Sequence, residues 1–159
     1  MKIHRVTVTF TDVWGVNTSR TNYGTVTGFN FAAHGRREYA VQIGGSVHVE
    51  KGLTVTAALR DPDNWQTLEG WLNHRNGCIE GVPPIGSLGF AAGLFGALFF
   101  VVLILSFMAW AGGSGAHALG IGMSIAFGLA ALYAVDSWYR KMKVWNELEA
   151  ARAKNNSVP

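Results

Sequence analysis

The strongest constraint in this sequence is a run of 55 residues, from Gly81 to Val135, that contains no Lys, Arg, Asp or Glu. All 13 basic and 10 acidic residues of the 159-residue chain lie on either side of this run. Its two apolar blocks, 88–110 and 118–135, predict helices of about 34 Å and about 27 Å, against a bilayer hydrocarbon core of about 30 Å. The sequence therefore predicts a transmembrane helical hairpin with residues 111–117 as its external turn.

The charges around this hairpin predict its orientation. Basic residues flank both ends of the hairpin, whereas the turn contains none, so the positive-inside rule places both termini in the cytoplasm. The first ten residues lack the apolar core of a secretory signal, which favours the same side. We therefore expect a multi-pass protein of the bacterial inner (cytoplasmic) membrane, with the lipid bilayer as a partner. The residues expected to set its depth at the membrane interface are Trp110, Trp138, Tyr139, Arg140, Lys141 and Lys143.

Small residues recur every four positions in both predicted helices. They are Gly89, Gly93, Ala97, Gly120, Ser124 and Gly128. In lipid, such stripes allow close approach of helix backbones, which supplies much of the association energy. Two alternatives stay open: the stripes close the hairpin on itself, or one of them contacts a second copy or a membrane-protein partner. A homo-oligomer is expected in the second case.

Residues 1–80 have the pattern of a small β domain. Alternation and turn signals predict strands at 2–10, 25–31, 38–43, 53–59 and 66–72. Five short strands favour an antiparallel five-stranded β-barrel that is OB-like, with an SH3-like barrel as the alternative. The predicted fold class is thus an α+β membrane protein: this barrel, a Pro-rich linker at 81–87, the hairpin, and a helical extension.

Aromatic and basic residues of this domain are candidates for binding. Phe29, Phe31 and Tyr39 alternate on neighbouring predicted strands with Arg36 and Arg37 close by. The pattern fits packing in the core, a protein-binding face, or base stacking. Eight basic and seven acidic residues in 1–80 leave the domain near neutral, which argues against a dedicated nucleic-acid binder.

The segment 136–159 predicts an amphipathic cytoplasmic helix with a frayed end. Trp138, Met142, Trp145 and Leu148 form an apolar stripe that would pack on the barrel, lie on the bilayer or pair with another copy. Trp145 is accordingly a further candidate for partner binding. Asp136 and Arg140 are spaced for an ion pair within the helix.

No pattern in the chain predicts catalysis. His74 and Cys78 lack the second ligand pair of a zinc site, and no phosphate-binding loop or nucleophile motif is present. We therefore expect no catalytic, cofactor or metal residues, no enzyme activity and no small-molecule substrate. The favoured function is a non-enzymatic inner-membrane adaptor or regulator whose barrel binds a protein partner while the hairpin anchors it and self-associates. The alternatives are an oligomeric pore-forming or membrane-disrupting effector with the barrel as sensor, and a membrane-tethered nucleic-acid binder.

Overall fold

The computed structural model describes the backbone of residues 2–22, 24–83, 85–111 and 117–156. Within these ranges the side chains of residues 85–88, 91, 92, 95, 109–111, 117–124 and 156 lie outside the described part. The chain divides into two compact units, Met1–Pro83 with Met142–Pro159, and Pro84–Lys141. We call the first the β unit and the second the helical unit.

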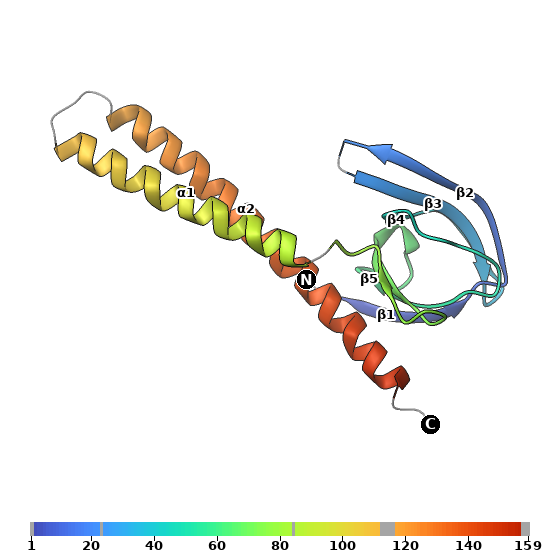
Figure 1. Cartoon of the computed structure of the whole chain (residues 1–159). Coiled ribbons are helices and arrows are strands. Elements are labelled where there is room, and N and C mark those ends of the chain that lie inside the picture. Colours follow the sequence, from blue (N-terminus) through green and yellow to red (C-terminus); the bar gives the residue numbers. More distant parts are fainter. Residues whose placement is uncertain (1, 23, 84, 112–116, 157–159) are drawn as a thin grey trace. The chain divides into compact units, whose positions relative to one another are not determined.

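The strands of the β unit form two antiparallel sheets (Figure 1). Sheet A has the order β1-β5-β6-β7 and consists of β1 (His4–Thr9), β5 (Thr54–Leu59), β6 (Leu68–Asn73) and β7 (Ile79–Glu80). Sheet B has the order β2-β3-β4 and consists of β2 (Asp12–Thr21), β3 (Gly24–Ala33) and β4 (Arg36–Gly44). The chain crosses between the sheets at two residues: Phe10 N donates to Leu53 O (2.9 Å), and Thr11 N donates to Ala32 O (2.8 Å).

This architecture corrects the predicted fold class. The predicted five-stranded OB-like barrel and its SH3-like alternative are both wrong, because the strands form separate sheets of four and three. The prediction missed β2 and β7. From Gly15 to Thr21, β2 is exposed on both faces, so no apolar alternation marks it in the sequence. β7 has only two residues.

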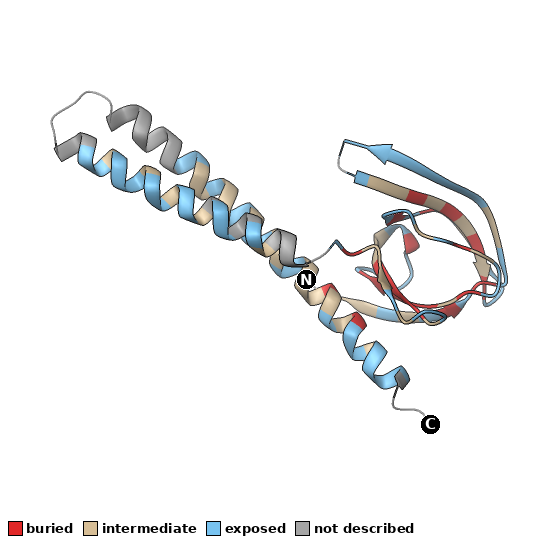
Figure 2. Ribbon diagram, in the orientation of Figure 1, coloured by how far each residue is buried: buried red, intermediate tan, exposed pale blue. Residues whose placement is uncertain are grey.

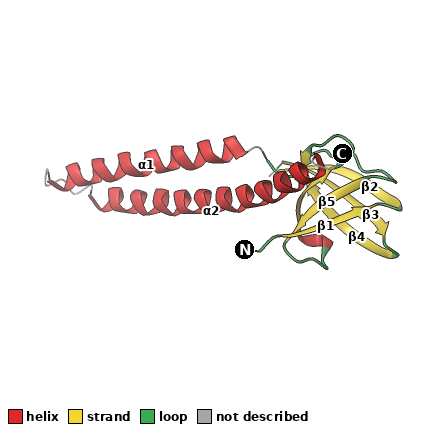
Figure 3. Ribbon diagram, turned by 90° about the horizontal axis from the view of Figure 1, so that it is seen from below, coloured by secondary structure: helices red, strands yellow, loops and turns green. Residues whose placement is uncertain are grey.

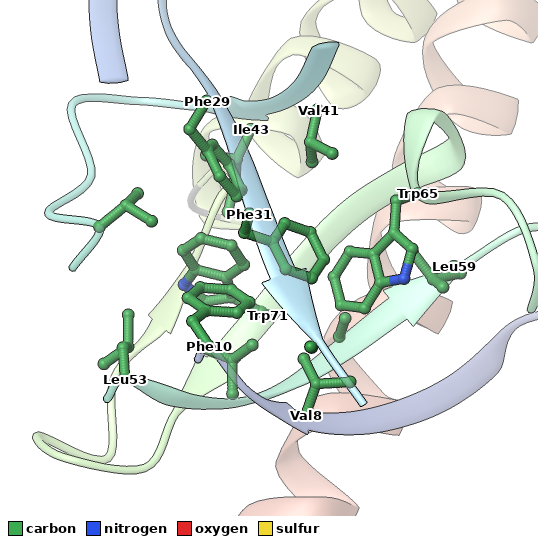
Figure 4. Packing of buried hydrophobic residues seen from close by; sticks show 14 residues of the cluster. Val8, Phe10, Phe29, Phe31, Val41, Ile43, Leu53, Leu59, Trp65 and Trp71 are labelled. Carbon is green, nitrogen blue, oxygen red and sulfur yellow. The ribbon is translucent and has the colours of Figure 1, made fainter. Parts of the chain in front are cut away.

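Aromatic side chains from both sheets fill the core between them (Figure 4). Phe10 lies 4.6 Å from Phe31 between ring centroids, and Phe31 lies 4.7 Å from Trp65 on the short 3-10 helix η1 (Trp65–Thr67). Trp71 of β6 is fully buried and meets Phe29 edge-on. Successive residues of a strand point to opposite faces, so residues two apart share a face, which is why the aromatic residues at 29 and 31 of β3 share this interior.

The last turns of α2 (His117–Asn156) cover the other face of sheet A. Val144 and Leu148, one helical turn apart, are fully buried with Ala58 and Leu72 of that sheet, and Figure 2 shows this buried patch on α2. Trp145 and Ala151 are partly buried against the same cluster. Of the three uses predicted for the C-terminal apolar stripe, packing on the N-terminal domain is the one observed.

In the helical unit, α1 (Ile85–Ala111) and the first part of α2 run antiparallel, side by side (Figure 3). Two contacts define the pairing. A Cβ at Gly128 would lie 3.1 Å from the ring of Phe99, and a Cβ at Gly89 would lie 3.4 Å from Trp138 Nε1. Both contacts place a glycine of one helix against an aromatic ring of the other.

The membrane assignments also need correction. A bilayer crossing requires about 20 consecutive apolar residues in one helix, and neither α1 nor α2 provides such a segment among the described residues. The predicted transmembrane helices at 88–110 and 118–135 are therefore not supported. The same finding overturns the multi-pass inner-membrane location, the anchoring role of the hairpin, and the pore-forming and membrane-tethered alternatives.

Candidate partner-binding surface

Three side chains gather on the outer face of sheet B, the face opposite the core. Trp14 of β2 and Tyr39 of β4 meet edge to face, with ring centroids 5.8 Å apart and an interplanar angle of 75°. The guanidinium carbon of Arg37 lies 5.9 Å from the centre of the Trp14 ring, within cation–π range. We call Trp14, Arg37 and Tyr39 the aromatic cluster.

Asn30 of β3 holds the backbone on both sides of this cluster through side-chain hydrogen bonds. Its Nδ2 donates to Trp14 O (3.3 Å), and its Oδ1 accepts from Ala40 N (2.9 Å). Both neighbouring strands are irregular here: the pairing shifts between Trp14 and Asn17 on β2 and between Phe29 and Phe31 on the β3–β4 side. One amide side chain therefore satisfies backbone groups on both edge strands where the regular ladder is interrupted.

Two backbone conformations make this arrangement possible. Gly15 has φ +65°, and a Cβ there would lie 2.7 Å from Asn30 Nδ2, so a side chain at this position would displace the amide. Ala40 has φ +53°, a left-handed conformation that is uncommon for a residue with a side chain. Such irregularities re-aim neighbouring side chains, and here they direct Trp14 and Tyr39 toward each other.

The cluster is accessible and chemically mixed. Tyr39 is 54% exposed, Arg37 is exposed and Trp14 is half-buried. An aromatic ring that is partly supported by its own domain loses little conformational freedom when it is covered, while Tyr and Arg add hydrogen-bond donors.

The aromatic cluster contains two of the six predicted partner-binding residues. Arg37 and Tyr39 belong to the aromatic cluster. Phe29 and Phe31 are 2% and 1% exposed in the core, and Arg36 lines a separate cavity with Glu38 and Trp65. Trp145 packs beside Leu148 on the other sheet.

The predicted helix-packing residues differ in their surroundings. Gly89 and Gly128 contact aromatic rings, as described above, whereas Gly93 and Ala97 are exposed and a Cβ at Gly93 would meet no described heavy atom within 4 Å. Gly120 and Ser124, which were also predicted to pack between helices, have surroundings outside the described part.

The residues predicted to mark a membrane interface lose that role with the hairpin. Trp138, Lys141 and Lys143 are half-buried, and Tyr139 and Arg140 are exposed, while the side chain of Trp110 lies outside the described part. The predicted ion pair is confirmed, with Arg140 Nη2 2.8 Å from Asp136 Oδ2.

Sequence reasoning missed Trp14 and Asn30. Trp14 precedes a glycine in a segment without strand alternation, and Asn30 lies between two core phenylalanines. The available signal was the pair Trp14-Gly15 shortly before the polar run 17–21, which is typical of an irregular edge strand. Among the residues with described positions, no group of three or more His, Cys, Asp or Glu is placed to hold a metal ion.

Comparison of the chain with protein-family models, with curated proteins and with solved structures found no match. The assignment of a function therefore depends on the geometry of the surface itself.

Proposed function

We propose that the β unit is a non-enzymatic protein-interaction module and that it binds its partner through the aromatic cluster and the adjoining edge strand β2. The observation that carries the proposal is the edge-to-face pair of Trp14 and Tyr39 with Arg37 over the indole. Trp, Tyr and Arg are the residue types most enriched among those that dominate binding energy at protein interfaces.

The two sheets of the β unit differ in how their outer faces are used. The C-terminal turns of α2 bury apolar residues on sheet A. On sheet B, the outer face at Trp14 and Tyr39 is covered by no element of the β unit among the described residues. A partner would therefore find accessible aromatic side chains on this outer face, at the aromatic cluster.

The edge of sheet B supplies the second half of the proposed surface. β2 has ten residues, pairs with β3 on one side, and is exposed from Gly15 to Thr21. An exposed edge strand presents backbone donors and acceptors that an added strand can satisfy. We infer that the partner contributes an extended segment that pairs with β2, packs an apolar side chain on Trp14 and Tyr39, and directs a carboxylate toward Arg37.

Crosslinking in intact cells tests this proposal with matched variants. Trp14→Ser and Tyr39→Ala remove the aromatic cluster, whereas Tyr139→Ala removes a Tyr of similar exposure from the helical unit. We expect a discrete crosslinked protein that is retained with Tyr139→Ala and is reduced at least about tenfold with either cluster variant, the loss typical of a dominant interface residue. An identical pattern in all three variants, with folding verified by thermal unfolding, contradicts the proposal.

The identity of the partner is a separate question that sedimentation of the purified chain answers. A concentration-dependent dimer that Tyr39→Ala abolishes would identify the partner as a second copy, in line with the predicted homo-oligomer. A monomer at all concentrations, together with a Tyr39-dependent crosslink in cells, would identify a different protein.

A further inference from the structure

A cleft separate from the aromatic cluster lies in the β unit, on the face of sheet A opposite the core. It is a cleft of about 370 Å³ between β1, β5 and the last turns of α2. Its polar lining consists of Arg5, Thr7, Thr56, His74, Lys154 and Asn155. These side chains come from four separate segments of the chain, and only the folded β unit brings them together.

A chain of hydrogen bonds leads from the sheet into this cleft. His74 Nε2 lies 2.8 Å from Thr56 Oγ1, and Thr56 Oγ1 lies 2.8 Å from Thr7 Oγ1. Thr56 is buried, whereas Thr7, the last hydroxyl in this series of hydrogen bonds, is exposed. When His74 Nε2–H donates to Thr56, the Thr56 hydroxyl donates to Thr7, and the Thr7 proton is directed to a group in the cleft.

The opposite direction of donation would present a lone pair of Thr7 to the cleft. An anion in the cleft selects the first direction, because it accepts the Thr7 proton and stabilises the whole chain in one orientation. Protonation of His74 selects the same direction, since both imidazole nitrogens are then donors. The hydroxyl chain is thus a donor that an anion can orient.

The charged side chains that line the cleft are positive, which also favours an anion. Arg5 and Lys154 are basic, and none of the lining residues is acidic. Arg5 also has an acidic neighbour, Glu147, whose Oε2 lies 3.6 Å from Arg5 Nε. That distance exceeds a direct hydrogen bond, so this exposed ion pair is loose and leaves the guanidinium able to bind a second acceptor.

We propose that this cleft binds a phosphate group, either free or as the monoester of a small metabolite. A tetrahedral phosphate has enough oxygens to accept from the Arg5 guanidinium, the Lys154 ammonium, the Thr7 hydroxyl and the Asn155 amide from different directions, whereas a carboxylate has two. The volume of about 370 Å³ exceeds that of the anion alone and lies within the range of small-molecule sites. This site is separate from the aromatic cluster, and its test is independent of the proposed protein partner.

The test is titration of the full chain with inorganic phosphate at constant ionic strength, followed by the NMR signals of the His74 ring. Phenyl phosphate in a second arm distinguishes a monoester from the free anion, and acetate in a third arm reports carboxylate binding. We expect saturable shifts with phosphate, at least about tenfold weaker binding in Arg5→Gln and Thr7→Val, and about tenfold preference for phosphate over acetate, since each lost charge-assisted contact has this typical effect.

Arg152→Gln is the matched control, because it removes a basic residue from the same turns of α2 outside the cleft. Lys154→Gln provides a variant at the exposed helix end that does not disturb the sheet. Saturable binding that weakens in Arg5→Gln, Thr7→Val and Lys154→Gln but changes less than about twofold in Arg152→Gln would support the site. Shifts that stay linear to high phosphate, or an equal loss in the control, would overturn it.

Discussion

Trp14 and Tyr39 meet edge to face although their strands are not neighbours in sheet B. β3 lies between β2 and β4, and adjacent strands are spaced about 4.8 Å apart, so the two rings must reach over Asn30 to attain their centroid distance of 5.8 Å. Asn30 lies on β3 between the strands that carry the two rings, and its side chain hydrogen-bonds to the backbone of both irregular strands.

Replacement of Asn30 should therefore loosen both edge strands together. In Asn30→Ala the backbone N–H of Ala40 loses its acceptor, and we expect its hydrogen exchange to accelerate strongly. Asn30→Asp retains an Oδ1 acceptor and should keep the Ala40 amide protected, although the bond donated to Trp14 O is lost. We expect Asn30→Ala to lower the free energy of unfolding by about 1–3 kcal/mol. Equal protection of Ala40 in both variants would show that this hydrogen bond does not hold β4.

The hydrogen bond between the Trp71 indole and the Glu80 carboxylate gives a second prediction. Trp71 is fully buried, and its Nε1–H donates to Glu80 Oε2 at 2.7 Å. Glu80→Ala leaves the indole N–H without this acceptor, and we expect a loss of about 1–3 kcal/mol in the free energy of unfolding. Glu80→Gln offers an amide oxygen to the indole but turns its own NH2 toward the Nδ2 atoms of Asn73 and Asn76, which donate to Glu80 Oε1, so it should recover only part of that loss. The measurement is urea unfolding followed by tryptophan fluorescence; equal destabilisation by the two variants would argue against the hydrogen bond as the cause.

The docking of α2 on sheet A depends on Leu148. This side chain is fully buried in the cluster with Ala58 and Leu72, so Leu148→Ala should cost about 2–5 kcal/mol through lost burial and the cavity that remains. Leu132→Ala is the control, because Leu132 is 69% exposed on the same helix, and its effect should stay within about 0.5 kcal/mol. Similar urea midpoints for both variants would contradict the assignment of the C-terminal turns to the β unit.

Two glycines with positive φ separate backbone strain from crowding. Gly35 has φ +77° and open space around it, whereas Gly81 has φ +86° and a Cβ there would lie 2.5 Å from Ile43 Cγ1. Gly35→Ala should cost about 1–2 kcal/mol from the left-handed conformation alone. Gly81→Ala should cost clearly more, because Ile43 is buried and cannot move freely. Thermal unfolding compares the two, and an equal cost would show that Ile43 yields.

Sequence patterns predicted the elements whose burial leaves a periodic signal. β1 alternates because one of its faces is in the core, and β5 is marked by a run of apolar and Thr residues that is buried on both faces. The C-terminal stripe is visible because Leu148 and Trp145 face the sheet. β2 is exposed on both faces and leaves no such signal, and without it the strands were assigned to one barrel. The bilayer prediction failed because it counted the whole uncharged run, whereas no helix among the described residues provides a long enough apolar segment.

The candidate sites were harder to predict than the strands. Arg37 and Tyr39 were proposed for partner binding, but Trp14 joins them only through the irregular pairing around Asn30. The phosphate cleft combines residue 5 with residues 56, 74 and 154. No local motif connects positions so far apart, and their proximity follows from sheet order and from the docking of α2.

The most direct test of the account is hydroxyl-radical footprinting of the chain alone and in its crosslinked complex. Tyr39 and Tyr139 are both exposed, at 54% and 59%, so they provide a site and an internal reference of the same chemistry. We predict that oxidation of Tyr39 and Trp14 falls several-fold in the complex while oxidation of Tyr139 is unchanged. Undiminished oxidation of Tyr39 in the complex would contradict the assignment of the outer face of sheet B as the binding surface.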